Sequence, residues 1–324
     1  MKFAFLFPGQ GSQKVGMGHD LARDFEAARA TFAEADQTLG FKLSRLCFEG
    51  PEEELRITAN TQPAIVASSI AALRALHSEY GVVGQVAAGH SLGEYSALVA
   101  AGSIRLADAI RVVRERGRLM QEACPAGKGS MAALIGLELS SIQEICAEAS
   151  RSGEIAVPAN LNAPGQIVIA GHVGAVQRAI KLAQDRGSRM SVELNVSAPF
   201  HCPLMQPARE AMKPILESLE VSEPRFPVIA NVSAEVNRDR SRVVPLLLEQ
   251  ITAAVRWEES MVRLGSMGVD SAIEFGSGRV LAGLMRRINK GLRVHAAEDQ
   301  ATIRAIGKLI SAPAGQQTLG PERD

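Results

Sequence analysis

Residues 82–102 of the chain read VVGQVAAGHSLGEYSALVAAG, and this stretch decides the fold class. The apolar run 82–88 predicts a short buried strand, and residues 92–101 predict a helix that ends at a glycine. Between them the pentapeptide 89–93 fits the G-x-S-x-G pattern, in which a sharp turn leads from a strand into a helix. The stretch therefore predicts an α/β protein with Ser91 exposed at one edge of its sheet.

A similar alternation of strands and helices surrounds this stretch. Residues 3–7 are apolar and lead into a glycine-rich turn, as a buried first strand would. One helix is predicted over 19–38, and another over 63–79, with Pro63 in its first turn and Gly81 at its end. Strands that alternate with helices form a parallel sheet covered on both faces.

The middle of the chain changes character. Strands and helices are predicted there in the order β-α-β-β-α-β, which is that of a ferredoxin-like module. The strands are expected at 130–136, 154–160, 166–171 and 189–195, and the helices at 140–150 and 173–186. The α/β pattern then resumes with strands near 226–231, 270–274 and 292–295.

These patterns predict two subdomains. Residues 1–126 and 197–311 form the larger α/β unit, and residues 127–196 form a small ferredoxin-like unit inserted into it. The tail 312–324 is rich in Gly, Pro and polar residues, so we expect it to be disordered. A length of 324 residues suits this division, because single domains commonly hold roughly 150 residues.

The overall composition argues against proteins that work by bulk charge. There are 35 Lys and Arg and 35 Asp and Glu residues, and this zero net charge disfavours a nucleic-acid-binding or membrane-surface protein. The apolar run at the N-terminus is too short for a secretory signal, and no stretch approaches the roughly 18 residues of a membrane span. The four cysteines lack metal-ligand spacing, so we expect reduced thiols, a cytoplasmic location and no metal site.

Ser91 is the candidate nucleophile. The glycines of the elbow permit the sharp turn and leave its Oγ exposed at the tip of the strand. The backbone N–H of Leu92 would then point to where an oxyanion forms, next to the positive end of a helix. The turn after the first strand offers the Gln10 N–H as a second donor, although an ordinary tight turn would have the same sequence.

Six histidines compete for the role of the base that accepts the serine proton. His201 lies between two prolines, which would stiffen its segment where the chain re-enters the larger unit. His295 ends a late predicted strand. With His295 as the base, the order Ser91, then Asp270 or Glu274, then histidine is that of an α/β-hydrolase. That alternative predicts an esterase or thioesterase.

Arg116 occupies an unusual place for a charged residue. The predicted helix 105–122 has an apolar stripe, and its other arginines cluster on the opposite, solvated side. At about 100° per residue, Arg116 falls on the flank of the apolar stripe. A guanidinium turned toward the core needs an anion, which is either a protein carboxylate in a structural salt bridge or a carboxylate of the substrate.

At these residues the chain resembles the malonyl-CoA:acyl carrier protein transacylase family, which includes the acyltransferase domains of polyketide synthases. The resemblance covers about residues 2–311. Its motifs are FPGQGSQ at 7–13, TQPA at 61–64, GHSLGEY at 89–95, RG at 116–117, NLNAPGQ at 160–166, SAPFH at 197–201 and EFGSGRVL at 274–281. Ser277 stands where the family often has proline. The resemblance implies an α/β-hydrolase-like parallel sheet core with an inserted ferredoxin-like subdomain.

The resemblance also implies a role for each residue that matches the family's catalytic motif. Ser91 is the nucleophile and His201 is its base. Arg116 binds the malonyl carboxylate. The backbone N–H groups of Gln10 and Leu92 hold the oxyanion.

Further positions follow from the same resemblance. The family orients its histidine with a backbone carbonyl, which falls here at Gln250. Gln62, Asn160 and Asn162 match positions that line the substrate cleft. Phe200 stands where methylmalonyl-selective relatives usually carry serine, so a bulky ring there implies a preference for malonyl worth about 1–3 kcal/mol.

The reaction implied is a ping-pong transfer of malonyl from malonyl-CoA, through a Ser91 ester, to the phosphopantetheine thiol of acyl carrier protein, with no metal or redox cofactor. That carrier is expected to be acidic. A basic cluster offers one candidate docking surface, or else a solvated face, and comprises Arg286, Arg287, Lys290 and Arg293. A trans-acting acyltransferase of a polyketide synthase and a non-catalytic carrier-binding module stay open as alternatives.

Overall fold

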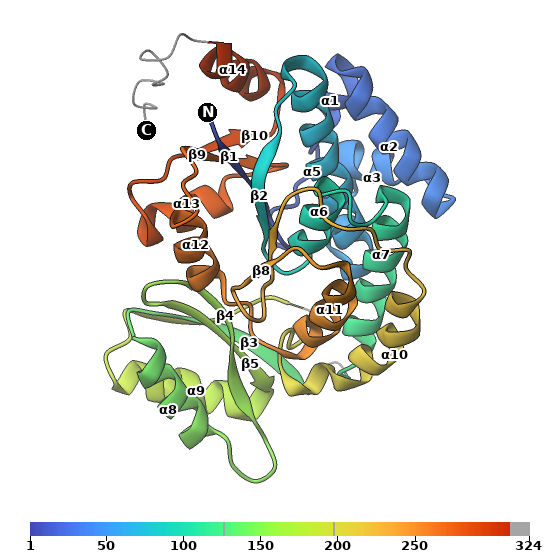
Figure 1. Ribbon diagram of the computed structural model, residues 1–324. Coiled ribbons are helices and arrows are strands. Elements are labelled where there is room, and N and C mark those ends of the chain that lie inside the picture. Colours follow the sequence, from blue (N-terminus) through green and yellow to red (C-terminus); the bar gives the residue numbers. More distant parts are fainter. Residues whose placement is uncertain (126, 197, 312–324) are drawn as a thin grey trace.

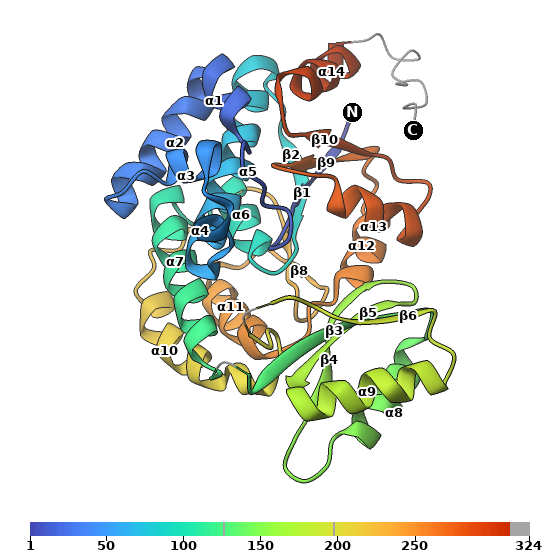
Figure 2. The same ribbon diagram turned by 180° about the vertical axis from the view of Figure 1, so that it is seen from behind.

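The structure is a computed structural model that describes residues 1–125, 127–196 and 198–311 (Figures 1 and 2). Two separate sheets organise the chain. The larger sheet lies between two layers of helices, and the smaller one lies below it in Figure 1, with helices α8 and α9 on its outer face. The predicted α/β class with a second, inserted sheet is confirmed. The predicted tail 312–324 lies outside the described residues.

The larger sheet has six strands in the order β10-β9-β1-β2-β7-β8. All neighbouring pairs are parallel except β7 and β8, which are antiparallel. The strands are β1 (Phe3–Phe7), β2 (Gly84–Gly89), β7 (Val228–Ile229), β8 (Val236–Asn237), β9 (Ser271–Phe275) and β10 (Val294–Ala297). In a parallel sheet the carboxyl ends of the strands meet at one edge, so the residues that follow β1, β2 and β7 come together there.

Helices cover both faces of this sheet, as the alternation of side chains in β1 requires. Phe3, Phe5 and Phe7 pack into the core shared with α2, α5 and α7. Ala4 and Leu6 face the opposite way, into the core formed with α12 and α13. All five strand residues are buried, which explains why β1 reads as a continuous apolar run.

The helices of the larger unit follow the chain from both sides of the insertion. They are α1 (His19–Asp24), α2 (Glu26–Leu39), α3 (Leu43–Glu49), α4 (Glu52–Arg56), α5 (Thr58–Tyr80), α6 (Gly93–Ala100), α7 (Leu106–Glu122), α10 (Gln206–Glu217), α11 (Val243–Thr252), α12 (Trp257–Gly265), α13 (Val280–Ile288) and α14 (Gln300–Ser311). Two short 3₁₀ turns, Pro203–Met205 and Arg240–Arg242, precede α10 and α11.

The single helix predicted over 19–38 is wrong, because the chain forms α1 and α2 with a break at Phe25. Phe25 has extended backbone angles, φ −126° and ψ 121°, and its side chain is buried. The break lets this ring enter the core, and burial of a phenylalanine outweighs the hydrogen bonds that a continuous helix would add.

The helix predicted to start near Pro63 begins earlier, at Thr58, so Pro63 lies inside α5. The additional turn packs against α7, where a Cβ on Gly117 would lie 2.6 Å from the Thr58 carbonyl oxygen. The Thr61 hydroxyl donates to the carbonyl of Leu55 at 2.5 Å, which ties the start of the helix to α4. Tertiary packing therefore overrides the usual place of proline in the first turn. The predicted end at Gly81 is correct.

The smaller sheet has the order β4-β5-β3-β6 and is antiparallel throughout. Its elements are β3 (Gly129–Ile135), α8 (Leu139–Ala149), β4 (Ala156–Ala163), β5 (Gln166–His172), α9 (Val173–Asp185) and β6 (Met190–Glu193). This order and the β-α-β-β-α-β sequence are those of a ferredoxin-like module. The subdomain boundaries after residues 126 and 196 stay a prediction.

Strand β4 runs three residues beyond its predicted end, so Asn162 lies in the strand and the turn shrinks to Pro164 and Gly165. This extension joins the two sheets. Val255, just after α11, forms a parallel bridge to Asn160, and its N–H donates to the carbonyl of Ala159 at 2.9 Å. The hydrogen bonds hold the smaller sheet against the carboxyl edge of the larger one.

Candidate active site

The elbow at Ser91 has the geometry that its glycines permit. Ser91 has a φ of 52°, in the left-handed region that is costly for a residue with a side chain. A Cβ on Gly89 would lie 1.9 Å from the Gly93 carbonyl oxygen, and one on Gly93 would lie 2.2 Å from the Phe7 carbonyl oxygen. Only glycine fits at both positions, so β2 and α6 approach closely and Ser91 lies at the strand tip.

His201 contacts the serine directly. Its Nε2 lies 2.7 Å from Ser91 Oγ, and its Nδ1 lies 2.8 Å from the Gln250 carbonyl oxygen. A carbonyl only accepts, so Nδ1 carries the proton and Nε2 presents its lone pair to the serine hydroxyl. Burial, assisted by the nearby charge of Arg116, lowers the pKa of His201 to about 3. The imidazole is therefore neutral at pH 7.

Arg116 lies beside the same serine and is only 1% exposed. Its guanidinium donates to Gln62 Oε1 at 2.9 Å, to Gln250 Oε1 at 2.9 Å and to Ser91 Oγ at 3.2 Å. Within residues 1–125, 127–196 and 198–311, no Asp or Glu oxygen comes within ion-pair distance of this guanidinium. The alternative of a direct structural salt bridge is therefore wrong.

A cavity of about 410 Å³ opens between the two sheets at this point. Such a volume suits a small-molecule site. The resemblance assigned a role in the site to ten residues. Nine of them line the wall, namely Gln10, Gln62, Ser91, Leu92, Arg116, Asn160, Asn162, Phe200 and His201, and Gln250 lies behind Arg116 and His201.

The two predicted oxyanion donors come from different segments of the larger unit. Gln10 follows β1 and Leu92 is the N-cap of α6, and both line the cavity with Ser91. In the described part of the chain no protein acceptor pairs with either backbone N–H. Donors left open at the start of a helix and in a turn suit an anion that forms during a reaction.

Two asparagines of β4 form the wall that the smaller sheet contributes. Asn162 Oδ1 accepts a hydrogen bond from His90 Nε2 at 2.8 Å. Asn160 is 9% exposed, and its Oδ1 is one of the buried side-chain atoms that has no hydrogen-bond partner among the described residues. The two side chains therefore differ, since one supports the wall and the other is open to a ligand donor.

Sequence reasoning missed Asn231, which supports the elbow from behind. Its Oδ1 accepts from the Ser91 N–H at 2.7 Å, and its Nδ2 donates to the Gly89 carbonyl at 2.7 Å. Its own N–H donates to Glu94 Oε2 at 3.2 Å. The available signal was position, because Asn231 is a polar residue just beyond a buried strand at the same sheet edge as Ser91.

The hydrolase arrangement through His295 is wrong. His295 lies in β10, three strands away from β2, which is about 14 Å at the usual strand spacing. Asp270 accepts from the Lys2 N–H at 2.6 Å, and Glu274 accepts from the N–H groups that begin α13. None of these three residues lines the cavity.

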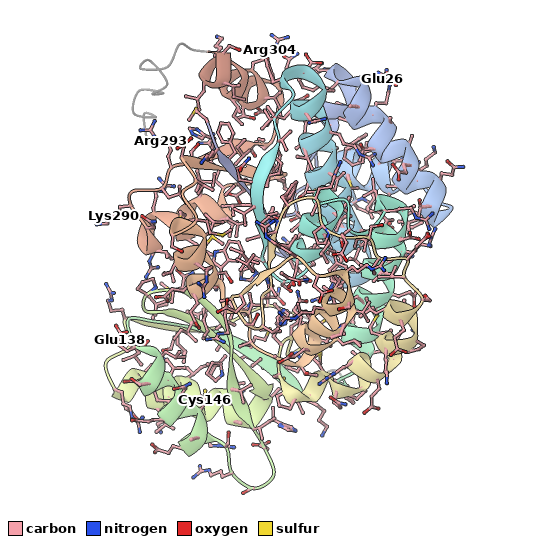
Figure 3. All side chains as sticks on the ribbon, in the orientation of Figure 1. Glu26, Glu138, Cys146, Lys290, Arg293 and Arg304 are labelled. Atoms are coloured by element: carbon pink, nitrogen blue, oxygen red, sulfur yellow. The ribbon has the colours of Figure 1, made fainter. Side chains whose placement is uncertain are left out.

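Two residues of the basic cluster lie on α13, a helix that also lines the cavity, and the other two follow it in the chain. Val280, Leu281 and Leu284 of α13 line the cavity, and Arg286 and Arg287 are in the last turn of the same helix. Arg287 also donates to Gln166 Oε1 at 2.6 Å. Figure 3 shows Lys290 and Arg293 on the outside of the molecule beyond this helix.

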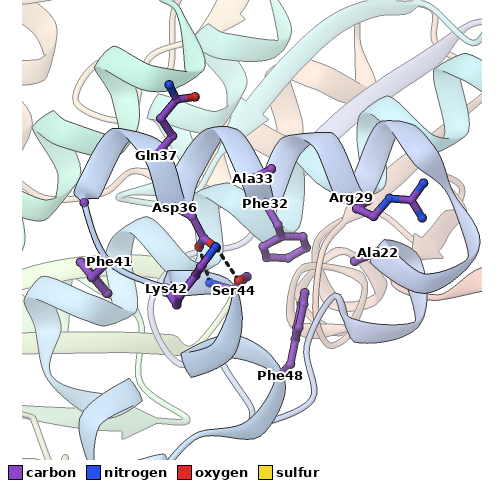
Figure 4. A pocket seen from close by; sticks show the side chains of 11 residues that line it. Ala22, Arg29, Phe32, Ala33, Asp36, Gln37, Phe41, Lys42, Ser44 and Phe48 are labelled. Carbon is purple, nitrogen blue, oxygen red and sulfur yellow. Dashed lines mark hydrogen bonds and ion pairs between the residues drawn. The ribbon is translucent and has the colours of Figure 1, made fainter.

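A second pocket, of about 430 Å³, lies between α2 and α3 and has a different character (Figure 4). Its buried carboxylate, Asp36, accepts from the Ser44 N–H at 2.8 Å and from the Ser44 hydroxyl at 2.7 Å. Lys42 lies 3.4 Å from the same carboxylate. The buried charge of this pocket already has its partners, so we assign no chemistry to it.

Neither a metal-binding cluster nor a membrane-spanning helix occurs among the described residues. No group of three or more His, Cys, Asp or Glu side chains in that part of the chain is arranged to hold a metal ion. No helix there combines the length and apolar character that crossing a bilayer requires.

Comparison with known proteins agrees with this geometry. Residues 4–317 match the family model described as acyl transferase domain. A malonyl CoA-acyl carrier protein transacylase of Bacillus subtilis is 46% identical over 302 residues, which are 93% of this chain and 95% of that protein.

Solved structures match over the same length. An acyl carrier protein S-malonyltransferase of Vibrio cholerae is 46% identical with a TM-score of 0.92, over 94% of this chain and 100% of that one. A malonyl-transacylase solved in complex with its type II polyketide synthase acyl-carrier protein is 44% identical with a TM-score of 0.91, over 94% and 98%. The chain therefore belongs to the acyl transferase domain family and is a member of the malonyl CoA-acyl carrier protein transacylase family expected from its motifs.

Proposed function

We propose that this chain transfers a malonyl group from malonyl-CoA to the phosphopantetheine thiol of acyl carrier protein, through an ester on Ser91. One observation carries the proposal. Ser91 Oγ lies within hydrogen-bond distance of both a neutral imidazole and a buried guanidinium that has no carboxylate partner. The imidazole can activate the serine hydroxyl, and the guanidinium can bind a carboxylate.

In the first half-reaction His201 Nε2 takes the proton of Ser91 Oγ, and Oγ forms a bond to the thioester carbon. The Gln10 and Leu92 N–H groups stabilise the oxyanion that develops on the thioester oxygen. The carbon–sulfur bond then breaks, and the coenzyme A thiolate takes the proton from His201. Donors of this kind commonly contribute about 10²–10³ in rate each.

Arg116 selects the acyl group. In a malonyl ester of Ser91, two carbon atoms separate Oγ from the free carboxylate, and the guanidinium lies 3.2 Å from that Oγ. Burial is the main cause of the lowered pKa of His201 and the charge of Arg116 is the second, and a carboxylate bound there offsets this second cause. Malonyl therefore raises the basicity of the imidazole on arrival, whereas acetyl does not.

In the second half-reaction the carrier thiol gives its proton to His201 and attacks the acyl carbon of the Ser91 ester. The bond between this carbon and Ser91 Oγ breaks, and Oγ takes the proton from His201, which restores the serine. We propose that the carrier docks on the basic cluster, at the end of α13 and just beyond it. An acidic carrier would be attracted to the positive charges of this cluster. Four free, buried cysteines support a reducing, cytoplasmic setting.

The test is intact mass after mixing with malonyl-CoA. The native chain gains one malonyl mass, and Ser91→Ala gains none. His201→Ala loses the adduct whereas His295→Ala keeps it, and the opposite result restores the hydrolase arrangement. A native chain without any adduct supports the carrier-binding module instead.

Carrier proteins of fatty acid and of polyketide synthesis both present the same thiol arm. Transfer from the preformed Ser91 ester to each carrier, followed by the mass of the carrier, compares the two. A faster transfer to the fatty acid carrier supports that pathway, and a faster transfer to the polyketide carrier supports a trans-acting acyltransferase.

A further inference from the structure

The buried guanidinium of Arg116 poses a question that the transfer mechanism does not answer. A charge that is 1% exposed normally has an anionic partner in direct contact. Here the partners are two amide oxygens and a hydroxyl. Arg116 Nε is buried and has no hydrogen-bond partner among the described residues. The donor capacity of this side chain is therefore not exhausted.

The two glutamines have only one orientation that the arginine accepts. A guanidinium only donates, so Gln62 and Gln250 must both present Oε1 to it, on NH1 and NH2 respectively. The ring of Tyr95 adds a cation–π contact, with its centroid 5.7 Å from Arg116 Cζ. These neutral contacts hold the guanidinium from several sides.

The nearest negative charge reaches Arg116 only through one of these amides. Gln250 Nε2 donates to Glu94 Oε2 at 2.7 Å and to the Ser91 carbonyl at 3.0 Å. The Gln250 amide therefore lies between the guanidinium at its oxygen and a carboxyl oxygen at its nitrogen. Glu94 is 3% exposed, and burial raises its pKa to about 7, so this carboxyl group is only partly ionised near neutral pH.

We propose that Gln62, Gln250 and Glu94 form an arginine holder, which fixes Arg116 with neutral amide oxygens and keeps the nearest carboxyl group one amide away. The holder determines specificity, because it leaves the guanidinium open to a carboxylate on the acyl group. A carboxylate in direct contact would occupy Arg116 and force the substrate to compete. The inference rests on the proposed function, since it assigns the residues that prepare Arg116 for malonyl.

The test converts the holder into a direct ion pair by changing single atoms. Gln62→Glu places a carboxylate against Arg116 NH1 and leaves Ser91, His201 and Gln250 in place. We measure loading of Ser91 from malonyl-CoA and from acetyl-CoA. The ratio of malonyl to acetyl loading is expected to fall roughly 10- to 100-fold, the effect of losing one or two charge-assisted hydrogen bonds. Urea denaturation of the variant beside the native chain reports whether the fold is intact, and the acetyl rate serves only as the denominator of the ratio.

A second variant moves a carboxyl group to a new position without adding another. The exchange Gln250→Glu with Glu94→Gln preserves the net charge and brings the carboxylate from behind the amide into contact with Arg116. The ratio falls again. Gln13→Glu is the matched control, because Gln13 lines the same cavity and its Oε1 bonds the Gly11 N–H rather than Arg116. Its ratio should fall less than that of Gln62→Glu, since Gln13 Oε1 is bonded to the Gly11 N–H and not to Arg116.

The possible outcomes separate the two proposals. A native chain that prefers malonyl while Gln62→Glu keeps the preference overturns the holder alone. An equal fall in Gln62→Glu and Gln13→Glu also overturns it, because general repulsion then explains the result. If Arg116→Ala keeps the native preference, the clamp in the proposed function is wrong and the holder falls with it.

Discussion

Replacing Asn231 with alanine tests whether the serine elbow depends on a side chain 140 residues away in the sequence. The change removes two hydrogen bonds of 2.7 Å, to the Ser91 N–H and to the Gly89 carbonyl. Asn231 is 1% exposed, so both backbone groups lose their partner in the interior. Leaving a buried group unsatisfied costs about 1–3 kcal/mol, so the two together lower the free energy of unfolding by roughly 2–6 kcal/mol.

The same change also removes support for the backbone conformation of Ser91. Ser91 is held at a φ of 52°, a conformation that costs about 1–3 kcal/mol and persists only while its surroundings enforce it. We expect the rate of Ser91 acylation in Asn231→Ala to fall about tenfold or more, since each 1.4 kcal/mol in the barrier is a factor of ten. The malonyl to acetyl ratio should change less than the rate, because Asn231 reaches Arg116 only indirectly, through a 3.4 Å hydrogen bond that its Oδ1 accepts from Gln250 Nε2.

The assay combines urea denaturation with the rate of adduct formation by mass spectrometry. Asn231→Asp serves as the matched variant, because it keeps the acceptor for the Ser91 N–H and loses the donor to the Gly89 carbonyl. Its acylation rate should fall less than that of Asn231→Ala, whereas its stability should fall at least as far, because a buried carboxylate oxygen then faces the Gly89 carbonyl oxygen. A free energy of unfolding within about 0.5 kcal/mol of native for Asn231→Ala, with an unchanged acylation rate, would refute the reasoning.

Of four further predictions, two concern the proton of His201, one the acyl group and one the carrier. Because the pKa of His201 is lowered from 6.5 to about 3, acylation measured by adduct formation should keep its rate down to about pH 5, whereas loss of half the rate near pH 6.5 contradicts a depressed pKa. As the pH falls, His201 binds a proton in the unfolded state before it does so in the folded state. Its contribution to the free energy of unfolding is therefore present above pH 6.5 and is lost as the pH falls toward 3, and urea titrations at several pH values measure this loss. Phe200→Ser should raise methylmalonyl loading relative to malonyl by roughly tenfold, and an unchanged ratio in the competition assay excludes the ring as a filter. Arg286→Glu with Lys290→Glu should raise the KM for the carrier and leave acylation by malonyl-CoA unchanged, so equal losses in both half-reactions would place the carrier elsewhere.

Local sequence predicted the parts of the fold that local physics controls. The apolar runs of β1 and β2, the glycines at 89 and 93 and the module between Gly129 and Glu193 each carry their own signal. The break at Phe25 and the helical turn before Pro63 do not. Both depend on packing against distant elements. The Phe25 ring packs into the core, and the turn at Thr58 packs against Gly117 of α7.

The candidate site shows the same division. Ser91, His201 and Arg116 could be singled out because an elbow, a proline-flanked histidine and a misplaced arginine are visible in single segments. The amide side chains that hold them carry no such mark. Asn231 and the side chain of Gln250 act through partners more than 100 residues away along the chain.

The amino-acid sequence by itself determined which groups are candidates for the chemistry, namely Ser91, Arg116 and two histidines, because a strand tip, a helix face and a stiff segment are properties of neighbouring residues. Only the tertiary structure decided that Arg116 pairs with two amides rather than a carboxylate. That choice depends on which side chains fold against α7, and a pattern within one helix contains no information about the chemistry of the opposite wall.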